Sequence, residues 1–259
     1  MTLAQAMGRW LTTGDTLVPI FQVFPPDMSE KEIEQSNQQA FTSSEAAATV
    51  AAMNHLGRPV QIVVADTIED SAAVDHIEAE DVIIAVDGQP VDQPGQVQEQ
   101  VRAKSPGEEI TLTVRRGGDE VEETIPLGEN PQDPGAPMLG ILMTSEPTDG
   151  IDVEYNLQDV GGPSAGMIFS LAVIDKLSPG ELNGGRHVAG TGTISEDGTA
   201  GPIGGIVHKV RAAEEKGTEL FLAPADNCLE AISRDHGDMV IAKVTTLDDA
   251  ITAMADFDA

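Results

Sequence analysis

Cysteine, aromatic residues and basic residues are all scarce in this sequence. One cysteine, Cys228, occurs in 259 residues, which excludes an internal disulfide and a cysteine-based zinc cluster. A lone thiol can pair with a histidine as a nucleophile, but a small core residue is the commoner role and the one expected for Cys228. Aromatic residues make up 3% of the chain, so Ala, Val, Ile, Leu and Met must build its cores.

Positive charge is the second shortage. Fourteen Lys and Arg residues stand against 44 Asp and Glu residues, which gives a formal net charge of −30. A chain of this charge repels phosphates, so nucleic acid is excluded as a partner. The acidity favours solubility and weak non-specific association instead.

Long apolar runs and metal-binding spacings are missing too. No stretch of about 18 apolar residues occurs, so no segment is expected to span a membrane, and the chain as given is expected to be soluble. Its start, MTLAQAMGRWLTTG, lacks the basic and apolar regions of a signal peptide. Because no histidine lies in a spacing such as HExxH, we expect no metal and no cofactor.

The residues that are present predict a mixed α/β (α+β) fold, with a β-rich module followed by a second domain. Residues 1–58 are predicted to form a helical lead-in segment, with Asp27 or Ser29 as the candidate N-cap and Gly57 as the candidate end. A second cap signal at 42–44 predicts the start of an alanine-rich helix. We expect this segment to pack on a neighbouring domain.

Residues 59–130 read as a small β-rich domain. PVQIVVAD and EDVIIAVDGQPV are strand-like, and Asp87–Gly88 is a strong turn signal. QPGQVQEQVRAK predicts a short helix, and EEITLTVRRGGDEVEETIPL predicts two strands joined at Gly117–Gly118.

Residues 59–128 resemble a PDZ domain of the kind attached to bacterial proteases. PDZ domains bind peptides by adding a strand to a sheet edge. Glu80 departs from the pattern, because the family usually has glycine just before the Asp that opens the DVI strand. The resemblance therefore leaves two interpretations open: a peptide-binding module, or a PDZ-like fold that only shapes access to another site.

Residues 131–259 are predicted to form the second domain. The Gly- and Pro-rich stretch GENPQDPGAPMLG, 128–140, is the predicted linker. Strands are expected in LGILMTSE, IDVEYNL and RHVAGTGTI, and helices in SAGMIFSLAVIDKL and IVHKVRAAEEKG. The alternation ELFLAP, ADNCLEAISRDHG, MVIAKV, LDDAITAMADF predicts a sheet covered by helices.

Ser164, in GGPSAG at the start of a predicted helix, is either a helix cap or a nucleophile. The letters fit the G-x-S-x-G elbow of α/β-hydrolases. That elbow needs a larger parallel sheet, followed by an acid and a histidine, and the chain after Ser164 is short for it. A Ser-His-Asp triad with His187 or His208 nevertheless stays open as an alternative, since triad members need not be close in sequence.

Three segments in register, GGPSAG, GTGTI and GPIGGIVHK, resemble the proteolytic domain of the Lon proteases over residues 137–259. The resemblance implies that Ser164 is the nucleophile, Lys209 the general base and Thr191 the threonine that hydrogen-bonds the lysine. We expect the oxyanion to be stabilised by backbone N–H groups around Gly162–Ser164, in the turn formed by Gly162 and Pro163 at the helix N-terminus.

The same positions differ from the Lon pattern in two places. Many Lon proteases have Asp three residues before the serine, where this chain has Gly161, with Asp159 close by. The usual KEK around the lysine is VHK here, which introduces His208. Neither change removes Ser164 or Lys209.

A lysine acts as a base only when it is neutral. Its pKa must fall from about 10.4 by about 3 pH units to act near pH 7, at a cost of about 4 kcal/mol. Burial among apolar residues can do this, and Ile206 and Val210 flank Lys209 in the predicted helix.

Taken whole, the chain resembles the PDZ-containing, Lon-like proteases of bacteria. The resemblance implies a homo-oligomer such as a hexamer, and an N-terminal membrane anchor with the protease outside the cytoplasm. The given chain has no such anchor, so we expect a shortened form that meets the membrane only through that missing segment. Although Lon proteases include ATP-dependent peptidases, no G-x-x-x-x-G-K-[ST] motif occurs here.

These observations predict an ATP-independent Ser/Lys endopeptidase that cleaves unfolded proteins or peptides through an acyl-enzyme. The PDZ-like module would recruit substrate or control access to the site. The alternative is a non-catalytic peptide-binding or scaffold protein with a Lon-like fold.

Overall fold

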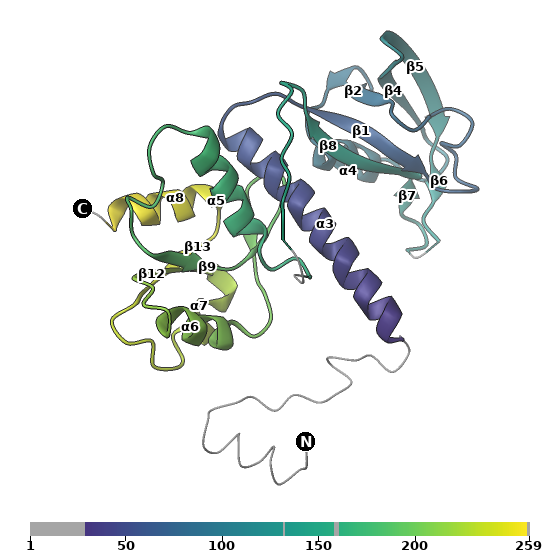
Figure 1. Cartoon of the computed structure of the whole chain (residues 1–259). Helices are drawn as coiled ribbons and strands as arrows, with labels where there is room; N and C mark the ends of the chain where they lie inside the picture. The colour runs from purple at the N-terminus through teal and green to yellow at the C-terminus, as the bar shows by residue number, and fades with distance from the viewer. Residues whose placement is uncertain (1–28, 132, 158–160, 258–259) are drawn as a thin grey trace.

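A computed structural model describes residues 29–131, 133–157 and 161–257 of the chain (Figure 1). Two compact units lie on either side of one long helix, α3 (Glu30–His55). We call the sheet-rich unit formed by 59–147 the PDZ-like unit. The α/β unit consists of 148–157 and 161–257 together with α3. Mixed helices and sheets confirm the predicted fold class.

The PDZ-like unit is built on one antiparallel sheet, in the strand order β5-β4-β2-β1-β8. Alternating apolar residues turn one face of the sheet inward, as in Ile110, Leu112 and Val114 of β4, which are fully buried. Helix α4 adds Val97 and Val101 to the same core. The elements of this unit are β1 (Val60–Thr67), β2 (Val82–Val86), β3 (Gln89–Pro90), α4 (Pro94–Arg102), β4 (Glu109–Arg116), β5 (Asp119–Pro126), β6 (Gly128–Glu129), β7 (Pro137–Met138) and β8 (Ile141–Pro147).

The predicted linker 128–140 does not separate two domains in the structure. It contains β6 and β7, which pair with each other, and it leads into β8, which pairs with β1 along its length. The sheet therefore extends past the predicted boundary at 130/131. Glycine and proline are dense here because the chain turns tightly between strands, as at Gly140, where φ is +84°.

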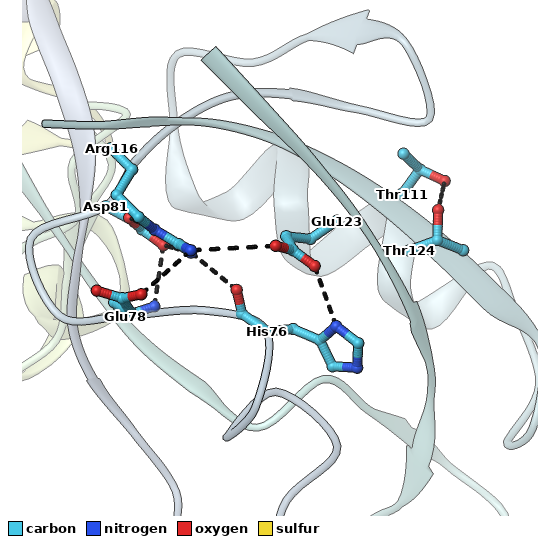
Figure 2. A network of polar contacts seen from close by, with 7 residues as sticks. All are labelled: His76, Glu78, Asp81, Thr111, Arg116, Glu123 and Thr124. Carbon is cyan, nitrogen blue, oxygen red and sulfur yellow. Dashed lines mark hydrogen bonds and ion pairs between the residues drawn. The ribbon is translucent and has the colours of Figure 1, made fainter. Parts of the chain in front are cut away.

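A buried carboxylate organises one end of the PDZ-like unit. Asp81 is 1% exposed and accepts hydrogen bonds from Arg116 Nε at 2.8 Å, Arg116 Nη2 at 2.6 Å and the Glu78 N–H at 2.9 Å (Figure 2). Arg116 also donates to the His76 carbonyl oxygen, and His76 Nδ1 lies 3.1 Å from Glu123. Burial by itself raises the pKa of Asp81, but these hydrogen bonds and the positive charge of Arg116 outweigh it and hold the pKa below its ordinary value.

Glu80, next to that carboxylate, has a left-handed backbone with φ of +72°. This conformation favours glycine, and a non-glycine residue in it carries strain. The turn expected for the PDZ resemblance is therefore present although its glycine is not. Two hydrogen bonds to Val64 hold this turn, one from the Glu80 N–H to the Val64 carbonyl and one from the Val64 N–H to the Asp81 carbonyl.

Helix α3 is continuous over 26 residues, so the second helix start predicted at 42–44 is wrong. Of the two predicted N-caps, Ser29 begins the helix through a capping box with Glu32, and Asp27 lies outside the described residues. The alanine-rich second half approaches α5 (Gly166–Leu177) closely. Phe41 packs edge-to-face on Phe169 of α5, with ring centroids 5.7 Å apart.

The α/β unit has three layers. Its central parallel sheet has the order β13-β12-β9, and β12 is buried on both faces. Leu220 and Leu222 face the layer of α3, α5 and α8, while Phe221 and Ala223 face α6 and α7. Its further elements are β9 (Val188–Gly190), β10 (Thr193–Ile194), β11 (Ala200–Gly201), α6 (Ile206–Glu214), β12 (Leu220–Pro224), a 3-10 turn (Ala225–Asn227), α7 (Cys228–Ala231), β13 (Val240–Val244) and α8 (Leu247–Asp256).

The sequence predicted most of these elements but not all. IDVEYNL, 151–157, is not a strand, and ADNCLEAISRDHG forms only the 3-10 turn and the short α7. Helix α3 belongs to the core of the α/β unit, although it is distant in sequence from the rest of that unit. Residues 56–140 separate it from β8, and further residues separate β8 from α5. The PDZ-like unit thus sits between two parts of the α/β unit, and its ends are adjacent, since Val60 pairs with Pro147.

Within the described residues, every helix is too short or too polar to cross a membrane.

We predict that Arg116→Ala destabilises the PDZ-like unit by about 3–5 kcal/mol, because Asp81 would become a buried, unpaired charge. The measurement is the free energy of unfolding from a urea titration at pH 7. Arg115→Ala is the matched control, since Arg115 is the exposed neighbour on the same strand. Equal losses in the two variants would contradict this role of Arg116.

Candidate functional site

Ser164 lies in the turn that leads into α5. The helix begins at Gly166 with Ala165 as its N-cap, so Ser164 precedes the cap and is not the cap itself. The Ser164 side chain is therefore free of the usual capping hydrogen bond. Of the two interpretations from the sequence, the cap is wrong.

The turn is held by Thr191 and Gly192, which directly follow strand β9. The Ser164 carbonyl oxygen accepts hydrogen bonds from the Gly192 N–H at 3.0 Å and from Thr191 Oγ1 at 2.8 Å. Thr191 is 2% exposed and its own N–H donates to the Leu222 carbonyl of the central strand β12. The sheet thus fixes the backbone of Ser164.

Lys209 approaches the same turn from α6. Its Nζ lies 2.7 Å from Ser164 Oγ and 2.9 Å from Thr191 Oγ1. The three residues predicted from the sequence therefore meet, although 27 and 18 residues separate them along the chain. Because the single hydroxyl proton of Thr191 goes to the Ser164 carbonyl, Thr191 Oγ1 accepts from Lys209.

The Lys209 side chain is partly buried. Ile206 and Val210, one turn apart on α6, are 0% and 2% exposed and anchor the helix in the core beneath it. Burial lowers the pKa of Lys209 below its ordinary value, which is the direction a general base requires. Among the described residues, no carboxylate forms an ion pair with Lys209 that would oppose this shift.

A clamp that the sequence did not predict holds the loop before α6. Asn227 is 6% exposed; its Oδ1 accepts from the Ile203 N–H at 2.7 Å, and its Nδ2 donates to the Ile203 carbonyl at 3.0 Å. Gly205 then starts α6 with φ of +69°. The Asn227 amide thereby mimics a strand partner and sets the position from which Lys209 projects.

The predicted oxyanion turn needs a correction. The Gly162 N–H donates to the Asn37 carbonyl of α3 at 3.0 Å, and Pro163 has no N–H to donate. Neither residue is thus a donor toward a substrate here. The next two N–H groups, of Ser164 and Ala165, have no backbone acceptor within the described part of the chain and are the donors at this helix start.

Helix α3 braces the turn from the other side. Besides the Asn37 contact, Ser44 Oγ donates to the Pro163 carbonyl at 3.2 Å. A Cβ at Gly166 would lie 2.8 Å from Ser44 Oγ and 2.8 Å from Ile194 Cγ2, so only glycine fits at the first position of α5. The spacing of the turn from α3 therefore depends on Gly166.

The remaining candidates lie apart from this arrangement. His187 and His208 are exposed, and Ser164 Oγ is hydrogen-bonded to Lys209 rather than to a histidine. Cys228 is a free thiol of intermediate exposure at the start of α7. Asp159 lies outside the described residues. The described chain contains no group of His, Cys, Asp and Glu that could hold a metal ion.

Two known protein families match the two units of this chain. Residues 158–255 match the Lon protease (S16) C-terminal proteolytic domain, and residues 34–127 match the PDZ domain. This chain joins a PDZ domain to a Lon-type proteolytic domain. The PDZ match contains β1–β5 and α4 together with part of α3, and the Lon match contains α5–α7 and most of α8. We therefore call the PDZ-like unit the PDZ domain and the α/β unit the proteolytic domain, and the Lon match supports a serine protease.

Similar proteins agree with the proteolytic domain. Lon protease 2 of Bacillus subtilis is 29% identical over 113 residues, which cover 42% of this chain and 20% of that protein. The archaeal Lon protease of Methanothermobacter thermautotrophicus is 38% identical over 94 residues, covering 36% of this chain and 14% of that protein. The chain thus spans a fifth or less of these relatives' length.

Solved structures similar to this chain include PDZ domains. The PDZ domain of an SdrC-like protein from Listeria monocytogenes is 22% identical, with a TM-score of 0.30, and the match covers 32% of this chain and 85% of that domain.

We predict that Gly166→Ala destabilises the proteolytic domain by about 1–3 kcal/mol, because the new methyl group would overpack the contact with Ser44 and Ile194. Thermal unfolding followed by circular dichroism measures the change. Gly95→Ala is the matched control: Gly95 is the second residue of α4, and a methyl group added there would have no atom within 4 Å. A melting temperature unchanged by Gly166→Ala would contradict the close approach.

Proposed function

We propose that the chain is a serine endopeptidase whose nucleophile is Ser164 and whose general base is Lys209. The observation that carries this proposal is the 2.7 Å distance between Lys209 Nζ and Ser164 Oγ. The lysine is also partly buried, which lowers its pKa. The match to the Lon proteolytic domain supports it independently.

In the first step, neutral Lys209 Nζ takes the proton of Ser164 Oγ while Oγ attacks the scissile carbonyl carbon. The resulting ammonium then gives that proton to the leaving amide nitrogen, the C–N bond breaks, and an ester on Ser164 remains. Water attacks this ester and transfers a proton to Lys209. When the ester C–O bond breaks, Lys209 returns the proton to Ser164 Oγ and the acid product leaves.

Thr191 orients the base. Because its oxygen accepts one Lys209 N–H at 2.9 Å, the nitrogen lone pair of the neutral amine is free to face Ser164 Oγ. The hydrogen bond from Thr191 to the Ser164 carbonyl ties the orienting group to the nucleophile's own backbone. One side chain therefore positions both partners of the proton transfer.

The oxyanion of the tetrahedral intermediate would be stabilised by the N–H groups of Ser164 and Ala165. Both belong to the turn at the N-terminus of the 12-residue helix α5, where the helix dipole favours negative charge. Gly162 contributes indirectly, since its hydrogen bond to Asn37 fixes the approach to this turn.

The PDZ domain would select substrates by strand addition. Its strand β8 is an edge strand, and a cavity of about 190 Å³ lies between β8 and α4. Val97, Val101, Leu139, Ile141 and Met143 give this cavity an apolar lining that fits one side chain of an extended peptide. We propose unfolded proteins or peptides as substrates, no ATP requirement for their cleavage, and a homo-oligomer as the working assembly.

Replacing Ser164 by Ala or Lys209 by Met is predicted to lower kcat/KM for casein by at least about a thousandfold, because each change removes one half of the proton transfer. Cleavage is followed by release of labelled fragments. Lys216→Met is the matched control, since Lys216 is exposed just beyond α6. If both site variants keep full activity, the chain acts as a scaffold or uses another site.

The pH dependence of cleavage is predicted to follow the neutral form of Lys209. Activity should rise as the pH rises through the lowered pKa of Lys209, with the midpoint below that of a free lysine, about 10.4. The measurement is kcat/KM for a peptide substrate between pH 5 and 11. His187→Ala and His208→Ala should leave the curve unchanged, and a limb lost in either variant would indicate a Ser-His hydrolase instead.

A further inference from the structure

A second, larger cavity lies between α3 and β8, on the side of the PDZ domain that faces the proteolytic domain. Its volume is about 820 Å³, and Met143 and Thr144 of β8 line one wall. The other wall is one face of α3, with residues spaced three or four apart: Gln35, Gln38, Gln39, Thr42, Ser43 and Ala46. We call this cavity the α3–β8 groove.

The lining of the α3–β8 groove carries no charged side chain. In a chain with 44 acidic residues, the segment between Glu34 and Glu45 of α3 has none, and three of the residues in the groove are glutamines. A glutamine amide both donates and accepts hydrogen bonds, so it pairs with peptide N–H and C=O groups alike. The chemistry of this wall therefore suits the main chain of an extended polypeptide, without preference for its charge.

The α3–β8 groove lies at the unpaired edge of strand β8. Neighbouring residues on a strand point to opposite faces, so a cavity that touches both Met143 and Thr144 lies over the edge of the strand. On that edge β8 pairs with no other strand of the described residues, and Leu142 is 52% exposed. Unpaired N–H and C=O groups on an edge strand accept an added strand.

The α3–β8 groove continues the apolar cavity between α4 and β8. Met143 lines both cavities, and β8 runs from Ile141 in the first to Thr144 in the second. All strand pairs in this sheet are antiparallel, and a peptide added to β8 antiparallel has its carboxyl end beside Ile141. Its upstream residues then extend into the α3–β8 groove.

We propose that the α3–β8 groove is a second subsite, which binds the uncharged main chain of a substrate upstream of the residues held by the PDZ domain. This inference rests on the proposed peptide binding by the PDZ domain and extends it to α3. An added strand rises about 3.3 Å per residue, so its last three or four residues lie beside the part of β8 that lines the cavity between α4 and β8. Residues beyond these lie against the glutamine face.

The opposite face of α3 contacts the turn that carries Ser164, which connects the subsite to the proposed active site. Asn37 and Ser44, which contact Gly162 and Pro163, lie on the same helix within one turn of Gln38 and Thr42. Figure 1 shows α3 crossing between the two domains. A substrate bound along the glutamine face is thereby held by the same helix that braces the nucleophile turn.

The test uses two synthetic peptides and the whole chain. A tetrapeptide is first selected for binding from a library of random free C-termini, and an octapeptide then adds four Ser and Ala residues to its N-terminus. Fluorescence anisotropy gives both dissociation constants. The subsite predicts that the octapeptide binds about tenfold more tightly than the tetrapeptide. Failure to obtain any binding tetrapeptide would overturn the PDZ role itself, and with it the basis of the subsite.

Variants separate the subsite from the first cavity. The double variant Gln38→Glu, Gln39→Glu keeps the size of the side chains but adds charge, and it should remove the octapeptide's gain while leaving tetrapeptide affinity unchanged. Unchanged tetrapeptide affinity also reports that the PDZ domain is folded, and an unchanged melting temperature reports that α3 remains packed in the proteolytic domain. Ser36→Glu is the control, since Ser36 is exposed on α3 outside the groove lining. Equal affinities of the two peptides for the unaltered chain, or a gain that survives in the double variant, would overturn the proposal.

Discussion

The contact between a partly buried lysine amine and a serine hydroxyl is the constraint on which this structure depends. An amine of ordinary pKa is an ammonium at neutral pH and cannot take a proton. To act as the proposed base, Lys209 must therefore be kept out of water and away from negative charge, in a chain with a net charge of −30. The parallel sheet, the apolar anchors of α6 and the Asn227 clamp all act to hold that one nitrogen at 2.7 Å from Ser164 Oγ.

Helix α3 has two structural roles that normally belong to different elements. Its apolar face completes the core of the proteolytic domain, where Ala48, Ala51 and Ala52 are almost fully buried. Nearer its middle, the Asn37 carbonyl and the Ser44 hydroxyl hold the turn that carries Ser164 through hydrogen bonds rather than through charge. A helix used in both ways ties the position of the turn that carries Ser164 to the packing of the core.

The sequence was sufficient to predict that Ser164, Lys209 and Thr191 lie together, because three motifs occur in the order and at the separations of the Lon pattern. It could not reveal Asn227 or the Asn37 contact, since a single hydrogen bond between distant segments leaves no periodic pattern. Glycine and proline between 128 and 140 suggested a linker for the same reason that they suit tight turns between strands. Within the predicted oxyanion turn, Gly162 is not a donor toward a substrate, because the acceptor of its N–H lies on α3, more than 100 residues earlier, where no sequence pattern points to it.

The adjacent ends of the PDZ domain bear on how the chain folds. Val60 pairs with Pro147, the Thr148 N–H donates to the Pro59 carbonyl, and Arg58 pairs with Asp149. Once this domain has folded, a connection of about 90 residues acts as a loop of a few residues, which lowers the entropic cost of docking α3 on α5 by about 3 kcal/mol. The folded PDZ domain therefore holds the two pieces of the proteolytic domain close together, so its insertion adds little to the entropic cost of joining α3 to the rest of that domain.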